Sequence, residues 1–302
     1  MNAGLPDLTG RVAVVTGATG GMGQIIATDL AGAGAHVVTV ARSPARADAL
    51  RARIGPQATT RLDVVTADLS RRADVVTAAK TILDRHDQIH ILINNAGAHF
   101  PEHRVSPDGI EMHIALDYLA AYGMTTLLDA PLRRGRARVV NVASDTLNDT
   151  RQIKLASRPR PATLDLAGID DLAALNPAAG FVPFEAYARA KLMTVTAGYA
   201  LAHDFAADGV TVNALHPGIV ATDIIDDLIP PLLRPLRTLI RRSLLTPAEG
   251  ASSATRIAID PHLSGVTGRY FNRDTESRTP PVSHDPTTQQ RLLALSHAHF
   301  AA

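Results

Sequence analysis

A glycine-rich segment, residues 17–23, most constrains how this chain can fold. It follows a β-branched run over 11–16 and precedes a helical pattern over 24–33, so we expect a strand, a turn and a helix in that order. Glycines let the backbone turn sharply and approach a pyrophosphate, whose charge is met by free N–H groups of the following helix. The segment therefore predicts a nucleotide-binding turn. The residues expected nearest to the phosphates are Gly17, Gly21 and Gly23.

The end of the next expected strand, 36–41, indicates which nucleotide is bound. Nicotinamide enzymes place there either an acid that bonds the adenosine ribose or a base that accepts a 2′-phosphate. Arg42 follows the strand directly, Arg46 is close by, and no acidic residue occurs between Asp29 and Asp48. Arginine suits a phosphate, so the sequence favours NADP over NAD.

Strands and helices continue to alternate, with strands expected over 62–67 and 89–94 and a helix over 72–85. This pattern predicts a parallel sheet of βαβ units, in which ligands bind at the carboxyl ends of the strands. Asp68 stands at one such end and could accept a hydrogen bond from an adenine amino group. The segment 94–97 stands at another and could close over the adenosine side.

Tyr187 and Lys191 are four residues apart, which places a phenol and an ammonium group on one face of a helix. A cation beside a tyrosine hydroxyl favours the phenolate and lowers its pKa towards the working range of a proton-transfer group. The same spacing also occurs between solvated residues on surface helices. The expected strand over 138–144 ends in a second hydroxyl, that of Ser144.

Taken together, these motifs resemble the short-chain dehydrogenase/reductase family. Residues 16–23, 94–97, Tyr187 with Lys191, and 217–218 occur in the order found in that family. The resemblance implies one α/β Rossmann-type domain over residues 1–302, with a doubly wound parallel sheet of about seven strands. It also implies that Ser144 bonds the substrate oxygen, Tyr187 delivers a proton to it, and Lys191 binds the nicotinamide ribose.

The resemblance further implies a set of cofactor-binding residues. Those expected to contact NADP are Thr16, Gly17, Thr19, Gly21, Met22, Gly23, Arg42, Asp68, Leu69, Asn95, Ala96, Gly97, Tyr187, Lys191, Pro217, Gly218, Ile219 and Thr222.

Several segments depart from the compact family pattern. An insertion at about 145–180, with a helix expected near 169–175, resembles the extended loop of retinol-dehydrogenase-like and protochlorophyllide-reductase-like members and points to a bulky, apolar substrate. A substrate lid is expected at about 222–245, and a polar tail with one short helix at about 272–302. Asp117 occupies the position of the catalytic asparagine of the family, which alters the expected proton relay.

Composition excludes several other classes of protein. The 302 residues carry a net charge of +1, so no field attracts nucleic acid, and no apolar run is long enough to cross a bilayer. The chain contains no cysteine, and its first residues do not have the pattern of a targeting sequence, so we expect a cytoplasmic protein. A typical metal site in a sequence has two histidines on one face of a helix and a third ligand at a known spacing. The twelve histidines of this chain do not show that pattern, so no metal is expected.

The sequence therefore predicts an NADP-dependent oxidoreductase that interconverts a carbonyl and an alcohol on a small molecule, acting as a reductase. A homodimer or a homotetramer is compatible with this prediction. A non-catalytic NADP-binding sensor stays open because of Asp117. An epimerase or dehydratase of the same family is the other alternative.

Overall fold

The computed structural model describes residues 5–151, 158–221 and 244–301, and the following account concerns these residues. A single eight-stranded sheet runs through the molecule in the order β3-β2-β1-β4-β5-β6-β7-β8. The strands are β1 (Val12–Thr16), β2 (His36–Ala41), β3 (Leu62–Thr66), β4 (Ile91–Asn94), β5 (Arg138–Val142), β6 (Thr211–His216), β7 (Tyr270–Asn272) and β8 (Thr275–Glu276).

The first seven strands are parallel, which confirms the predicted doubly wound sheet. Strand β8 adds two residues that pair antiparallel with β7. Its segment was expected to be a tail, and so short a strand carries no periodicity that a sequence pattern could reveal.

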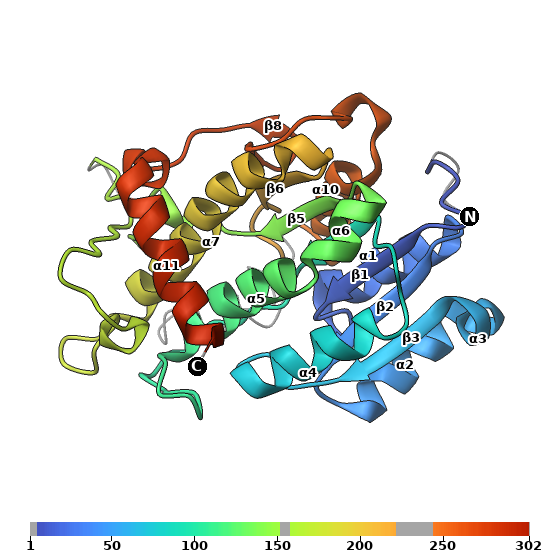
Figure 1. Cartoon of the computed structure of the whole chain (residues 1–302), viewed down its shortest axis with the longest axis horizontal. Helices are drawn as coiled ribbons and strands as arrows, with labels where there is room; N and C mark the ends of the chain where they lie inside the picture. Colours follow the sequence, from blue (N-terminus) through green and yellow to red (C-terminus); the bar gives the residue numbers. More distant parts are fainter. Residues whose placement is uncertain (1–4, 152–157, 222–243, 302) are drawn as a thin grey trace.

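Helices cover both faces of the sheet (Figure 1). They are α1 (Gly21–Gly32), α2 (Pro44–Ile54), α3 (Ala58–Arg61), α4 (Arg72–Leu83), the π-helix η2 (Ile114–Leu119), α5 (Ala120–Leu127), α6 (Asp129–Gly135), α7 (Pro183–Phe205), α10 (Pro247–Ile259) and α11 (Pro286–Ala301).

Two hydrophobic clusters form the core, one on each side of the sheet. Successive strand residues point to opposite faces, so Val14 packs in the cluster that contains Ile82 of α4, whereas Val15 packs with Ile26 of α1. Burial of both faces explains why the strands are nearly continuous apolar runs. The carboxyl ends of β1, β4, β5 and β6 consequently meet along one edge of the sheet.

The insertion between β5 and α7 is packed against the body of the protein through its apolar side chains. Leu164, Leu166, Leu172 and Leu175 are buried in the same cluster as α7. The helix predicted near 169–175 is wrong, because this stretch contains only a three-residue 3-10 turn at Leu172–Ala174.

The C-terminal segment contains a sixteen-residue helix, α11, where only a short helical segment was expected. Figure 1 shows it in red, beside α5 and α7. Leu292 and Leu295 are buried, and the buried Ser296 hydroxyl is hydrogen-bonded to the hydroxyl of Tyr118. Arg291 pairs with Asp170 of the insertion at 2.9 Å, so this helix holds the insertion in place.

Candidate active site

The glycine turn between β1 and α1 has the conformation that its sequence predicts. Gly17 and Gly21 have φ angles of +67° and +48°, which favour glycine. A Cβ atom on Gly23 would lie 2.3 Å from the Gly17 carbonyl oxygen, so a side chain there would push the turn apart. Among the described residues no side chain caps α1, and its first turn carries no acid. The free N–H groups and the positive end of α1 therefore fit a pyrophosphate.

The end of β4 is tied to this turn by hydrogen bonds. The backbone N–H groups of Asn95 and Ala96 donate to Thr16 Oγ1 at 3.1 and 3.0 Å. The Asn95 side-chain amide donates to the carbonyl oxygens of Thr16 and Gly17 at 3.1 and 3.2 Å. Thr16 and Asn95, both predicted as cofactor residues, thus shape the phosphate turn. Thr19 and Met22 lie in the same turn and are partly buried.

The ends of β2 and β3 carry the residues predicted to contact the adenosine. Arg42 and Arg46 are exposed, and neither has an ion-pair partner in the described part of the chain. Asp68 accepts hydrogen bonds from the Ser70 N–H and hydroxyl at 3.1 and 2.8 Å, which fixes its carboxylate at the end of β3. Leu69 is buried, so its backbone and not its side chain could contact a nucleotide.

The three predicted catalytic side chains are brought together at the carboxyl end of β5. Ser144 lies two residues after the end of β5, and Tyr187 and Lys191 lie on the same face of α7. All three are buried. Lys191 Nζ donates to the Val142 carbonyl oxygen at 3.1 Å and lies 5.6 Å from the centre of the Tyr187 ring. This arrangement can hold an oxygen atom of a substrate beside a proton donor and a cation.

Burial is the largest influence on the pKa of Tyr187 and raises it, and the Asp117 charge raises it further. Lys191 and a hydrogen bond with Ser144 lower the pKa, but they do not offset the burial. The net shift is therefore opposite to the one predicted from Lys191 alone. Tyr187 is a protonated phenol at neutral pH, which is the form that can donate a proton.

Asp117 is the side chain that most distinguishes this site. Its Oδ1 lies 3.2 Å from Lys191 Nζ and accepts a hydrogen bond from the Ala98 N–H at 3.0 Å. A Cβ atom on Gly97 would lie 2.4 Å from the same oxygen, so glycine is what permits this approach. Burial lowers the pKa of Lys191, but Asp117 and Tyr187 outweigh it and the net shift is upward.

The π-helix η2 carries Asp117. The wider turns of a π-helix interrupt the regular α-helical pattern before α5 at this position. The main-chain carbonyl of Asp117 accepts a hydrogen bond from Thr194 Oγ1 at 2.9 Å, so this residue is tied to α7.

A buried polar cluster beside Tyr187 was missed by the sequence analysis. His113 Nδ1 lies 2.7 Å from Glu111 Oε1, and His113 Nε2 accepts from the Phe100 N–H at 2.9 Å. Asn176, from the insertion, donates to Glu111 Oε2 at 2.9 Å. The insertion is thereby connected to the residues that surround Tyr187. No local sequence motif predicts this cluster, because its members come from three separate segments of the chain.

His99 is a second histidine beside Tyr187. Its ring centre lies 5.9 Å from that of Tyr187, in an edge-on arrangement, which is the same distance as that of His113. Both ring nitrogens are buried without a hydrogen-bond partner among the described residues. Burial, with a smaller effect of the neighbouring His113, lowers the pKa of His99 to about 4. His99 is therefore neutral at physiological pH, and the only signal in the sequence is its place two residues after Gly97.

The loop after β6 contains the residues predicted to contact the nicotinamide. Pro217 is buried, Gly218 packs against Leu245, and the Ile219 side chain is 57% exposed. Val220 forms a parallel bridge with Leu245, so the two ends of the expected lid lie side by side. Thr222 and residues 222–243 of that lid lie outside the described residues.

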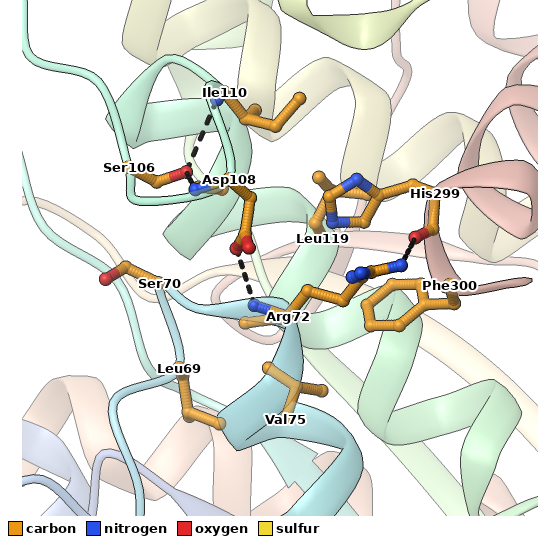
Figure 2. Close-up of a pocket in the computed structure, with 12 residues that line it drawn as sticks. Leu69, Ser70, Arg72, Val75, Ser106, Asp108, Ile110, Leu119, His299 and Phe300 are labelled. Carbon is orange, nitrogen blue, oxygen red and sulfur yellow. Dashed lines mark hydrogen bonds between the residues drawn. The ribbon is translucent and has the colours of Figure 1, made fainter. Parts of the chain in front are cut away.

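A small hollow lies apart from these side chains, between α4, α5 and the end of α11 (Figure 2). Arg72 crosses it: its backbone N–H donates to Asp108 Oδ2 at 2.7 Å, and its guanidinium group donates to the His299 carbonyl oxygen at 3.1 Å. Leu69 and Phe300 line it as well. None of the catalytic side chains borders this hollow, and its polar groups serve to attach the C-terminus.

None of the helices in the described part of the chain has the length and apolar character needed to cross a bilayer.

Comparisons with known proteins agree with the fold. The family model described as short chain dehydrogenase matches residues 11–153. The chain is 30% identical to polyprenol dehydrogenase of Homo sapiens, over 96% of this chain and 85% of that protein. It is 29% identical to retinol dehydrogenase 14 of Mus musculus, over 95% and 85%.

A solved structure from Beutenbergia cavernae, described as an NAD(P)-dependent gluconate 5-dehydrogenase with NADP bound at low occupancy, is also similar. It superposes with a TM-score of 0.65 at 25% identity, over 89% of this chain and 96% of that one. The glycine turn, the Ser144–Tyr187–Lys191 arrangement and these similarities lead to one conclusion: the chain is an oxidoreductase that belongs to the short-chain dehydrogenase/reductase family and resembles its retinol-dehydrogenase-like members.

Proposed function

We propose that this protein is an NADP-dependent reductase that converts a carbonyl group on a bulky, apolar small molecule to an alcohol. The observation that carries the proposal is the meeting of Ser144, Tyr187 and Lys191, all buried, at the carboxyl edge of the sheet. These groups can bind a carbonyl oxygen, protonate it and maintain a positive charge beside it.

The bound nicotinamide cofactor supplies hydride, and the protein supplies the proton. The Ser144 hydroxyl orients the substrate oxygen, and the Tyr187 hydroxyl donates its proton to that oxygen as negative charge develops. Lys191, protonated and buried beside the Tyr187 ring, stabilises the phenolate that remains. The glycine turn and the start of α1 hold the pyrophosphate, and Gly218 and Ile219 flank the nicotinamide side.

The preference for NADP rests on Arg42 and Arg46. Both guanidinium groups are exposed at the end of β2, and in the described part of the chain neither is paired with a carboxylate. An unpaired arginine there attracts a 2′-phosphate, whereas the acid that would bond an unmodified ribose is missing. The similar structure with NADP bound is consistent with this choice. The proposed direction of the reaction, reduction of the carbonyl, follows from the cofactor, because cells commonly keep NADPH reduced.

The inferred substrate class rests on the surroundings of Tyr187. The exposed Ile219 and the neutral His99 offer little to a charged or strongly hydrated substrate. The insertion reaches this region through Asn176. Two relatives are named for polyprenol and for retinol, which are both bulky apolar alcohols.

A panel of aldehydes and ketones tests this function. Purified protein should oxidise NADPH with retinal or a prenyl aldehyde, and much more slowly with small, hydrophilic carbonyls of equal reactivity. NADH should be the poorer cofactor with the same substrates. Turnover of only small polar carbonyls would overturn the assigned substrate class, and equal use of NADH would overturn the cofactor assignment.

A non-catalytic NADP-binding sensor is the second candidate, and the Asp117–Lys191 contact favours it. In that pair the Lys191 charge is directed towards a carboxylate, which weakens its effect on Tyr187. A sensor would bind NADPH tightly and show no turnover with any member of the panel. Slow oxidation of NADPH that is lost in Tyr187→Phe would exclude it.

A further inference from the structure

Three side chains from separate segments converge at the amino edge of the sheet, opposite to the catalytic edge. His36 is the first residue of β2, Asp63 is the second residue of β3, and His86 follows the end of α4. One ligand atom from each residue lies within 4.8 Å of the other two.

The register of the strands explains this convergence. Val38 pairs with Asp63 between the parallel strands β2 and β3, so both side chains point to the same face of the sheet. His36, two residues before Val38, points to that face as well. Val38 belongs to the core cluster beneath α4, and the chain leaving α4 brings His86 over the same face. The strand register therefore fixes His36 and Asp63, and the turn after α4 adds His86.

Two of the three distances between the ligand atoms match those in a metal site. His36 Nε2 and His86 Nε2 both lie 3.2 Å from the same oxygen, Asp63 Oδ2. Nitrogen and oxygen ligands about 2.0–2.2 Å from a tetrahedral zinc ion lie about 3.3 Å from one another. His36 Nε2 is also shielded from solvent, and among the residues that the structure describes it has no hydrogen-bond partner, although the carboxylate is close. A metal ion bound to both groups would satisfy this nitrogen.

The ligand set has the chemistry that a divalent cation needs. Asp63 supplies a carboxylate, and His36 and His86 supply imidazole rings, which bind metal ions in their neutral form. Arg85, next to His86 in the chain, is the unfavourable charge at this place.

We propose that His36, Asp63 and His86 bind one zinc ion, with water as the fourth ligand. The side chains of His36 and Asp63 are about a third exposed, at 33% and 32%, so solvent can reach an ion held between them. Two imidazoles and a carboxylate suit zinc and not magnesium, which prefers oxygen ligands. The sequence analysis expected no metal because it considered neighbouring histidines, and these ligands are brought together only by the fold.

The ion would join β2, β3 and the end of α4 far from Tyr187, so its effect is on stability. A ligand that binds the folded protein alone raises the free energy of unfolding in proportion to the logarithm of its concentration above Kd. Chelator-treated protein should therefore gain thermal stability with added Zn²⁺ and not with Mg²⁺. The turnover number at a temperature well below unfolding should stay the same.

Calorimetric titration of chelator-treated protein with Zn²⁺ tests the site. We expect one equivalent to bind, and His86→Gln and His36→Gln to weaken binding by at least about tenfold, which is the least that loss of even an outer-shell partner costs. The matched control is His203→Gln, because His203 also lies beside a carboxylate, Asp204 at 3.7 Å, but is 92% exposed. Equal zinc affinity in the unaltered chain and both site variants would overturn the proposal.

Diffraction at the zinc absorption edge tests whether the cluster binds zinc and needs no substitution. Crystals of the unaltered chain soaked in Zn²⁺ should contain an anomalous peak about 2.0–2.2 Å from His36 Nε2, His86 Nε2 and Asp63 Oδ2. A peak only at other histidines, or none, shows that the cluster is an ordinary His–Asp hydrogen-bonding group.

Discussion

Lys191 Nζ lies 3.2 Å from Asp117 Oδ1, and both side chains are almost completely buried. Burial raises the pKa of Asp117, Lys191 lowers it, and the net shift is upward. When Asp117 is ionised, the lysine that should lower the pKa of Tyr187 is accompanied by a negative charge, which a neutral amide at this position would lack. The contact therefore couples Asp117 to the pKa of the Tyr187 phenol.

The substitution Asp117→Asn should move the alkaline limb of kcat/KM to lower pH, with activity retained. Asp117 raises the pKa of Tyr187, so its removal lowers that pKa, and a proton donor loses activity as the pH rises through its pKa. The shift should be on the order of one pH unit, the usual scale of such effects. The pH profile should not change in Asp129→Asn, which removes a half-exposed acid of α6. A limb that stays in place or moves upward contradicts the coupling.

Tyr187→Phe should reduce turnover on the order of a hundredfold or more, because the ring stays and the transferable proton is lost. The affinity for NADPH, measured by titration, should be nearly intact. Tyr199→Phe is the matched control: it lies on the same helix and loses a hydrogen bond of 3.1 Å to Thr279, away from Ser144. Normal turnover in Tyr187→Phe would rule the mechanism out.

NADPH should bind at least about tenfold more tightly than NADH, a difference of about 1.4 kcal/mol. Arg42→Ala should remove most of this preference, because it weakens the binding of NADPH and leaves the affinity for NADH nearly unchanged. Arg53→Ala, which removes an exposed arginine of α2 further from the strand end, should leave the preference as it is. Parallel titrations of the three proteins check this, and an unaltered ratio in Arg42→Ala would assign the phosphate to another group.

Shortening residues 150–178 should raise the KM for a bulky substrate, but it would also remove Leu164 and Leu172 from the core. A finer change is Asn176→Gly, because Asn176 has a φ of +53° that glycine adopts freely. The substitution removes the hydrogen bond that the Asn176 side chain donates to the buried Glu111. Its loss should lower the free energy of unfolding by about 1–3 kcal/mol.

The KM of Asn176→Gly for a bulky aldehyde should rise severalfold, whereas the KM for a small aldehyde and the Kd of NADPH serve as internal controls. A change confined to NADPH binding would show that the insertion serves the cofactor.

Gly123→Ala should destabilise the protein by about 1–3 kcal/mol, the usual cost of overpacking. The added Cβ atom would lie 2.4 Å from Phe300 Cζ and 2.9 Å from Val75 Cγ1. Phe300→Ala should recover part of this loss in the double variant, as measured by urea unfolding. Strictly additive losses would mean that α11 does not pack on α5 as described.

The sequence predicts well whatever is local or repeated along the chain. The turn at 17–23 and the parallel strands depend on residues next to one another, and the structure agrees with both. Tyr187 and Lys191 share a helical face for the same reason. Their meeting with Ser144 follows from the rule that parallel strands end at one edge.

Side-chain groups assembled from distant segments could not be predicted in this way. Glu111, His113 and Asn176 meet because the insertion folds back, and nothing in the spacing of these residues fixes that path. The net shift of the Tyr187 pKa was opposite to the expected one because the degree of burial is a property of the packed structure. Helix α11 was underestimated because its apolar residues are few and its contacts lie far away in the chain.

The packing of α11 has a consequence for local opening of the fold. The buried hydroxyl of Tyr118, the neighbour of Asp117, is hydrogen-bonded to Ser296, which lies 178 positions further along the chain. A transient detachment of α11 would therefore remove a support of the π-helix that presents Asp117, while the bonds between the sheet strands stay in place.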